Sequence, residues 1–323
     1  MTPTSASPNV GGKAKKNGHT MRIKHRYLQY DSHLKIIKPV KALLDQSSNS
    51  YKYKEDLECV IPTFKYTLEF YLYEDSPNFI TLQKEINNFL KPQVIGTEYE
   101  KNDFKNAEWF IINAGEYQYP QPQNDFGYLQ ATFNTEYYCK TCGIGKVQNA
   151  PYRLRTLPKQ PNNQFWGLHW EFDAIFVRQE TKNIFEKENI KGIHFSNPVL
   201  HKKNIVIENF YQLHIDNILD KGFDNYNAQK ITCKINNEEG FKSDNILQNC
   251  GRVKFHHPRI GGYLFDKDIF NKYYDIVESY EYFGGGGSSS KLQIVSKKIK
   301  DIIDSNKLKG LSFIPVMHEK LTR

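Results

Sequence analysis

The feature that most constrains this chain is a pair of cysteines two residues apart, followed at once by a glycine. Cys139 and Cys142 bracket a Lys-Thr pair, and Gly143 comes next. Two thiols at this spacing can lie on one side of a tight turn, and glycine permits left-handed backbone there, so that amides point at the sulfurs. The pattern predicts a metal knuckle. The alternative is a chance pair of small buried residues.

The remaining cysteines favour metal binding over disulfides. The chain has five cysteines, which is an odd number for a disulfide framework, and clustered thiols in a reducing compartment are better explained by a metal. A second Cys-Gly lies downstream at Cys250-Gly251, but Leu247 stands where a second C-x-x-C would need a thiol. The other two cysteines are Cys59 and Cys233.

The net charge of +8 comes mostly from the beginning of the chain. Residues 1–26 carry six Lys and Arg and no acid, which leaves +2 for the rest. We expect residues 1–20 to be a disordered basic tail. The near-neutral remainder gives little support to nucleic-acid binding. With no long apolar run and no apolar signal segment, we expect a cytoplasmic protein with no membrane partner.

Two segments of the chain, residues 177–195 and 295–313, match at a constant offset of 118 residues. Each reads as a short amphipathic helix, a glycine at its end and a strand stopped by proline. A Cys-Gly precedes each segment, so we interpret them as a duplication whose two units a zinc ion could join. The identical pairs are Val177/Val295, Lys182/Lys300, Ile184/Ile302, Lys191/Lys309, Gly192/Gly310 and Phe195/Phe313.

The sequence predicts an α+β fold: two similar small α+β units with a C-x-x-C-G zinc knuckle, preceded by an N-terminal α+β segment. We expect strands over residues 64–73, 107–114 and 128–138, a helix over 79–90, and a strand followed by a helix over 201–219. The glycine run at 284–287 reads as a flexible hinge. The predicted parts are a tail (1–20), an N-terminal region (21–135), a first unit (136–202) and a second, partly degenerate unit (203–323).

Several segments after about Ala107 share a family pattern. They are Tyr138-Cys139-Lys140-Thr141-Cys142-Gly143, Pro151-Tyr152-Arg153-Leu154, Leu168-His169-Trp170, Cys250-Gly251-Arg252, Phe265-Asp266-Lys267-Asp268-Ile269-Phe270 and the stretch from Lys309 to Val316. With them the chain resembles the double-CXXCG-motif proteins, immunity proteins of bacterial toxin–immunity systems of the swarming-inhibition type.

In that family the two motifs look like a four-thiolate zinc site. The resemblance carries over to Cys139, Cys142 and Cys250, while Leu247 departs from the pattern. Cys233 lies close enough upstream to supply the fourth thiolate, with His256 or His257 as the next choice. A closed four-ligand zinc site is structural. The alternative is a decayed site whose cysteines are merely buried.

The resemblance implies an immunity protein that binds and neutralises a cognate bacterial toxin by recognition, without enzymatic chemistry. Consistent with this, the sequence has no G-x-S-x-G, no H-E-x-x-H and no nucleotide-binding loop. The loop from Tyr117 to Phe126, polar and aromatic together, is a candidate contact surface.

Two other classes of protein stay open. One is a zinc-ribbon protein that binds nucleic acid through the tail and the basic residues Arg153, Arg155, Lys159, Arg252, Lys254 and Arg259. The near-neutral charge beyond the tail argues against it. The other is a hydrolase built on His169, Glu171 and Asp173, although a histidine among aromatic residues is more typical of a packed core.

Overall fold

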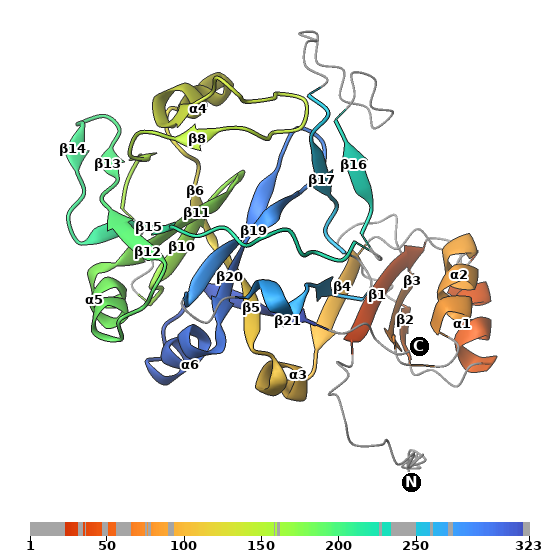
Figure 1. Cartoon of the computed structure of the whole chain (residues 1–323). Helices are drawn as coiled ribbons and strands as arrows, with labels where there is room; N and C mark the ends of the chain where they lie inside the picture. Colours follow the sequence, from red (N-terminus) through yellow and green to blue (C-terminus); the bar gives the residue numbers. More distant parts are fainter. Residues whose placement is uncertain are drawn as a thin grey trace.

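The structure is a computed structural model that describes residues 23–31, 35, 37–46, 51–55, 66–74, 76, 79–89, 94–157, 159, 162–225, 228–233, 250–258, 261–270 and 274–318. The predicted tail at 1–20, Cys59, Leu247 and Arg259 lie outside these residues. The described chain has the predicted α+β character, with helices and sheets arranged in layers (Figure 1).

The N-terminal layer is an antiparallel sheet of order β2-β3-β1-β4, with two helices packed together beside it (Figure 1). Ile37, Val40 and Leu44 recur at helical spacing in α1, and their buried side chains join those of α2 and β3 in one cluster. The strand expected over 64–73 and the helix expected over 79–90 are present. The elements are β1 (Ile23–Asp31), α1 (Ile37–Gln46), β2 (Tyr51–Glu55), β3 (Tyr66–Tyr73), α2 (Phe79–Phe89) and β4 (Val94–Tyr99).

A second sheet, of order β12-β15-β11-β10-β6, is antiparallel except for its β10–β6 pair. Its strand β11 runs into the helix α5, which returns the chain to the sheet edge. The elements are β6 (Glu116–Gln118), β10 (Phe165–Leu168), β11 (Glu171–Arg178), α5 (Gln179–Lys187), β12 (Ile193–Ser196) and β15 (Phe210–Ile215).

The third and largest sheet has the order β16-β17-β19-β20-β5-β21-β18. Its strand β5, predicted over 107–114, falls within the predicted N-terminal region but pairs with β20 and β21 near the end of the chain. The elements are β5 (Trp109–Ala114), β16 (Lys230–Thr232), β17 (Val253–Phe255), β18 (Tyr263–Leu264), β19 (Ile276–Phe283), β20 (Ser290–Ser296), α6 (Lys297–Ser305) and β21 (Leu311–Met317).

Short elements connect and cover these sheets. They are α3 (Lys101–Asn106), the 3-10 turns η1 (Asn124–Phe126) and η2 (Lys267–Ile269), α4 (Gly127–Thr132), the pair β7 (Phe133–Asn134) and β8 (Val147–Gln148), and the sheet of β9 (Arg153–Leu154), β13 (Val199–Leu200) and β14 (Ile205–Val206). None of the helices in the described part of the chain is both long and apolar enough to span a membrane.

Two expectations of secondary structure were wrong. Residues 128–138 begin with the helix α4, whose buried Tyr128 and Thr132 lie one turn apart, rather than with a strand. Residues 201–219, all of them described, contain the strands β14 and β15 and no helix. In β15 the alternating apolar pattern continues to Ile215, and the chain then leaves the sheet at Asp216.

The two matched segments have the same local structure. Both α5 and α6 begin and end at residues that are 118 apart, and both follow directly on a strand. Past each helix one residue has a positive φ, Asn189 at 51° and Lys307 at 54°. The glycines Gly192 and Gly310 then have φ of 90° and 111°, which favours glycine at both positions.

Each glycine turn packs at the start of a strand that pairs with the strand leading into the other segment's helix: β10 pairs with β11, and β19 pairs with β20. The backbone carbonyl of Lys309 accepts a hydrogen bond from the Phe165 N–H at 3.1 Å, at the start of β10. Correspondingly, the carbonyl of Lys191 accepts one from the Asp275 N–H at 3.1 Å, just before β19. The same contact is therefore made twice, once by each glycine turn.

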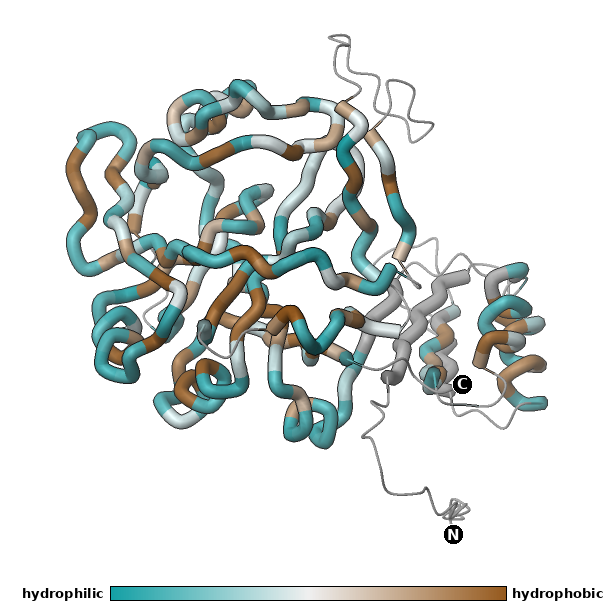
Figure 2. The backbone as a smooth tube through the Cα atoms, viewed as in Figure 1, coloured by the Kyte–Doolittle hydropathy of each residue, from teal (hydrophilic) through white to brown (hydrophobic). Residues whose placement is uncertain are grey.

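The main core lies where the second and third sheets meet. Phe110 of β5, Val177 of β11 and Val295 of β20 are fully buried in one cluster, together with apolar residues of α5 and α6. Figure 2 shows the corresponding hydrophobic strands in the interior, with hydrophilic residues interspersed along the outer helices. Burial of this surface supplies most of the driving force that joins the two sheets.

We expect Gly310→Ala to lower the free energy of unfolding by about 2–4 kcal/mol, because a left-handed non-glycine residue is strained and the new methyl group would overlap the Phe165 carbonyl. The matched control is Gly115→Ala, whose methyl group would meet nothing within 4 Å. Urea unfolding of both variants tests this. Equal losses of stability would contradict it.

Candidate metal centre

Four cysteine sulfurs converge where the connection between β7 and β8 meets the end of the β16–β17 pair. Cys139 Sγ lies 3.7 Å from Cys233 Sγ, Cys142 Sγ lies 3.7 Å from Cys250 Sγ, and all four sulfurs are within 4.8 Å of one another. Thiolates bound tetrahedrally at about 2.3 Å from zinc are roughly 3.8 Å apart, whereas a disulfide bond measures about 2.05 Å. The spacing therefore fits four ligands around one metal ion.

Burial makes a shared cation important for these thiols. Cys139, Cys142 and Cys233 are buried, and Cys250 is partly exposed. Burial raises thiol pKa values, but hydrogen bonds from the backbone of Cys142 and Thr141 bring the pKa of Cys139 down to about 7. Burial and the neighbouring Cys139 then hold the pKa of Cys142 well above its ordinary value. Four thiolates so close cannot all be charged unless a cation lies among them.

A tight turn presents the first two sulfurs. The Cys139 N–H donates to the Ile144 carbonyl at 2.8 Å, and the Gly143 N–H donates to the Cys139 carbonyl at 2.7 Å. Gly143 has a φ of 81°, and a side chain there would lie 2.5 Å from the Gly287 carbonyl oxygen. The glycine after the second cysteine is thus required both by the turn and by its neighbour.

A strand pair presents the other two sulfurs. Cys233 directly follows β16, Cys250 lies just before β17, and these strands are antiparallel neighbours. The Cys233 N–H donates to the Arg252 carbonyl at 2.9 Å, which continues the pairing to the level of the sulfurs. The four residues named from the sequence are therefore brought together, and His256 and His257 are outside the cluster. His257 instead hydrogen-bonds the Tyr263 hydroxyl at 2.7 Å.

Arg252 and Lys254 hold the loops of the metal centre, a role that the sequence did not reveal. Arg252 donates to the carbonyls of Tyr137 and Ile144 at 2.7 and 2.9 Å. Lys254 is 2% exposed, and its ammonium donates to the carbonyl of Cys142 at 3.1 Å. The two residues stand two apart, so their side chains lie on one face of the chain at β17, but nothing local in the sequence indicates the carbonyls that they bind. Since Lys254 is buried against the protein's own backbone, the nucleic-acid interpretation loses that residue.

The glycine run expected to be a flexible hinge has a different role. It forms the connection between β19 and β20, and it packs directly against the cysteine turn. Lys254 also donates to the carbonyls of Gly286 and Ser288, at 2.6 and 2.9 Å. The loop is therefore fixed over the centre by the same buried ammonium that holds Cys142.

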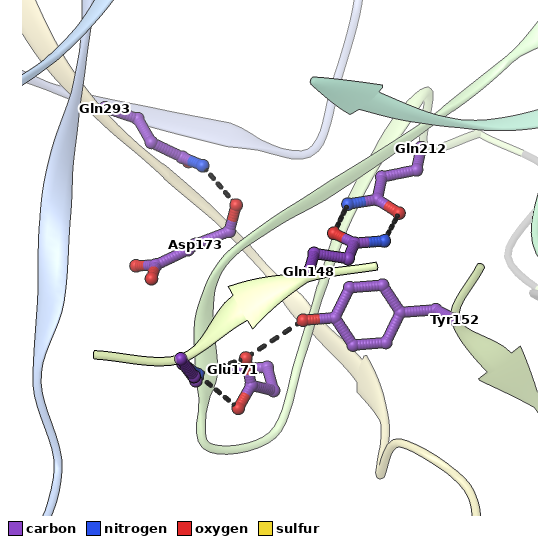
Figure 3. A network of polar contacts seen from close by, with 7 residues as sticks. Gln148, Tyr152, Glu171, Asp173, Gln212 and Gln293 are labelled. Atoms are coloured by element: carbon purple, nitrogen blue, oxygen red, sulfur yellow. Dashed lines mark hydrogen bonds and ion pairs between the residues drawn. The ribbon is translucent and has the colours of Figure 1, made fainter. Parts of the chain in front are cut away.

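The chain leaving the turn is anchored on the second sheet by a polar network (Figure 3). The Lys146 ammonium contacts both carboxylate oxygens of Glu171 at 2.6 Å, and the Tyr152 hydroxyl donates to the same carboxylate at 2.9 Å. The side-chain amides of Gln148 and Gln212 exchange two hydrogen bonds at 2.8 and 2.7 Å. The cysteine turn is thus tied to both sheets.

The residues of the hydrolase hypothesis do not form a common site. His169 pairs with Glu116 at the surface, whereas Glu171 is 1% exposed and engaged by Lys146. Asp173 lies near Gln293, whose side-chain amide donates to the Asp173 backbone carbonyl at 2.5 Å (Figure 3). His169 and Glu171 therefore have separate partners, and Gln293 contacts the backbone of Asp173 rather than its carboxylate.

Comparison with known proteins adds no assignment: neither a family model nor a curated protein matches the sequence.

The raised pKa of the Asp173 carboxyl predicts that the free energy of unfolding depends on pH. Burial raises its pKa from 3.8 to about 8; the carboxylates of Glu171 and Glu278 add to the rise, and Lys146 opposes it. Because the folded protein binds this proton more tightly than the unfolded chain does, stability is lost as pH rises from about 4 to 8.

We expect Asp173→Asn to remove this contribution, which is at most about 1.4 kcal/mol per pH unit for one proton. Urea unfolding at several pH values across that range measures it. The exposed Asp301→Asn is the control, and thiol titration is common to all three proteins. Identical pH slopes for the wild type and Asp173→Asn would contradict the expectation.

Proposed function

We propose that Cys139, Cys142, Cys233 and Cys250 bind one structural zinc ion. The observation that carries this proposal is the pair of 3.7 Å sulfur–sulfur separations, each joining the cysteine turn to the strand pair. Four soft thiolates in tetrahedral spacing suit zinc. Such a centre has no open position for a substrate, so its role is to stabilise the fold.

We further propose that the two matched segments belong to two units that arose by duplication, with zinc as the staple between them. Cys139 and Cys142 precede the first segment, and Cys233 and Cys250 precede the second. The reciprocal contacts of the two glycine turns support an origin in two copies of one unit. A zinc ion would add a strong link where the units otherwise meet through hydrogen bonds and apolar contacts.

Metal analysis by mass spectrometry tests the zinc proposal. We expect one zinc per chain in the wild type and close to none in Cys233→Ser, since three thiolates and water bind zinc far less well. Cys142→Ala should also lower the melting temperature. Cys59→Ser is the matched control and should keep the metal and the stability. A metal-free wild type, or equal behaviour of Cys233→Ser and Cys59→Ser, would refute the staple.

We infer that the protein is a cytoplasmic, non-catalytic immunity protein that binds and neutralises a cognate bacterial toxin. The support is the resemblance of the cysteine, Pro-Tyr-Arg-Leu and C-terminal Lys-Gly segments to double-CXXCG-motif immunity proteins. A closed structural metal centre agrees with a role in recognition. The inference does not depend on any catalytic group.

An exposed aromatic surface supports the choice of a contact site. Tyr119 stacks on both His169 and Trp170 with ring centroids 4.3 Å apart, and Phe126 lies 6.0 Å from Trp170. Phe126 is 56% exposed and Trp170 is 36% exposed. Large aromatic side chains held together at a surface are typical of the residues that dominate protein interfaces.

The backbone at this aromatic surface is strained. Phe126 has a φ of 56° and Trp170 a φ of 49°, in a region that bulky residues rarely adopt. Strain of this kind costs of order 1–3 kcal/mol and concentrates at functional sites. We therefore assign toxin recognition to the Tyr117–Phe126 loop together with Trp170.

The test is protection of cells from a toxin. We expect the gene to lie beside a larger toxin gene and its product to protect cells that express that toxin. The double variant Phe126→Ala/Trp170→Ala should lose protection while keeping its metal content and melting temperature. Ile80→Ala, which removes an exposed apolar side chain from the N-terminal layer, is the control.

The outcomes separate the two parts of the inference. Survival that is unchanged when the gene is deleted would refute immunity itself. Protection that persists in the aromatic double variant would refute only this contact surface. Loss of protection in both variants would point to a general loss of folded protein, which the melting temperatures would reveal.

A further inference from the structure

A pocket of about 650 Å³ opens beside the metal centre and has no role in the function proposed above. It lies between β19, the β16–β17 pair and the segment of residues 218–225 that crosses them. Phe223 and Phe255, each 8% exposed, line its apolar part. A volume of this size is typical of sites for small molecules rather than for folded partners.

The charged side chains that line the pocket are mainly cationic. Four cations, Lys221, Lys230, Arg252 and Lys291, face one carboxylate, Glu281. Among the described residues, none of the three lysines forms an ion pair. With Glu281 counted, the side chains that line the pocket still carry a net positive charge, and such a site attracts anions.

The single carboxylate is turned toward the backbone. Glu281 Oε1 accepts hydrogen bonds from the Gly222 and Phe223 N–H groups at 3.1 and 3.2 Å. These contacts fix the segment that carries Lys221. Arg252 is held by two carbonyls, as described above. The fold thus fixes the backbone beside Lys221 and the side chain of Arg252.

Tyr280 of β19 adds an aromatic side chain to the pocket. It is 55% exposed and alternates with the buried Ser279 and Glu281, so it lies on the outward face of the strand. The register between β19 and β20 shifts between Glu278 and Tyr282, and the Ser279 hydroxyl donates to the Glu281 carbonyl at 2.7 Å within this irregular stretch. Such irregularities are frequent next to binding sites.

Lys291 completes the site. It lies opposite Tyr282 in the strand pairing, with its ammonium 5.5 Å from the centre of that ring. Burial lowers the pKa of Lys291, although the carboxylates of Glu278, Asp173 and Glu281 oppose the shift. An ammonium in this environment gains from an anion that restores the interactions lost with water.

We propose that this pocket binds a small phosphate-bearing ligand, whose phosphates contact Lys221, Lys230, Arg252 and Lys291. Cations from four separate segments around one cavity suit a polyvalent anion, which can contact several of them at once. The ligand is a nucleotide if its other part stacks on Tyr280, and an inorganic polyphosphate if the phosphates alone are recognised. The proposal is independent of immunity.

Isothermal titration of the full zinc-loaded chain at physiological ionic strength tests the site, with inorganic tripolyphosphate and ATP as the probes. We expect saturable binding of tripolyphosphate and at least a tenfold weaker affinity in Lys221→Gln/Lys230→Gln. Both lysines are exposed, so their replacement leaves the core untouched. Metal content is measured before and after, because both probes chelate cations.

The control is Lys202→Gln/Lys203→Gln, which removes the same charge from the exposed turn before β14 and keeps the basic residues 1–26. ATP that binds more tightly than tripolyphosphate, with the gain lost in Tyr280→Ala, would support the site and identify a nucleotide. Equal affinities for the two probes would support the polyphosphate.

Two results would overturn the proposal. One is the absence of saturable binding of either probe, which would leave Lys230 as a charge that protects an edge strand from pairing. The other is an equal loss of affinity in the pocket variant and in the control variant, which would mean that net charge alone attracts the anion.

Discussion

The convergence of four sulfur ligands, three of them from buried cysteines, is the constraint on which this part of the molecule depends. The chain brings Cys139 and Cys142 on a turn against Cys233 and Cys250 at the end of a strand pair, at spacings that suit a shared cation. Two neighbouring polar contacts support that convergence: Lys146 ties the turn to the second sheet, and Lys254 ties it to the third. Without a cation, the thiols would remain largely protonated and the convergence would lose its main attraction.

The two matched segments also share one arrangement of strands. In each matched segment the strand before the helix and the strand after it are separated by one antiparallel strand, which is β15 in the second sheet and β5 in the third. The residue after that middle strand donates to the glycine carbonyl in both cases: Asp216 to Gly192 at 2.9 Å, and Gly115 to Gly310 at 3.1 Å. In the third sheet, β5, which comes from an earlier part of the chain, therefore occupies the middle position that β15 has in the second sheet.

The sequence alone could predict the features that depend on residues close together in the chain. The C-x-x-C-G spacing, the amphipathic helices and the buried strand of residues 109–114 each follow from neighbours in the chain, and all four converging cysteines could be named. Pairing partners could not be predicted, because nothing local to β5 indicates β20 or β21. Arg252 and Lys254 read as solvent-facing charges, since a buried lysine is recognised only when its three carbonyl partners are known. The helix α4 was missed because its six residues are too few for the helical period to appear.

The position of β5 sets the order of events during synthesis. It ends at Ala114, but both of its neighbours begin only at Ser290 and Leu311. At about 5–20 residues per second, a ribosome takes roughly 10–35 s to make the chain between them. For that interval β5 has apolar side chains and two unpaired edges, a state in which chaperones bind nascent chains. The largest sheet closes only when nearly all of this sequence has been translated, so a prematurely terminated product would lack both the sheet and the completed core.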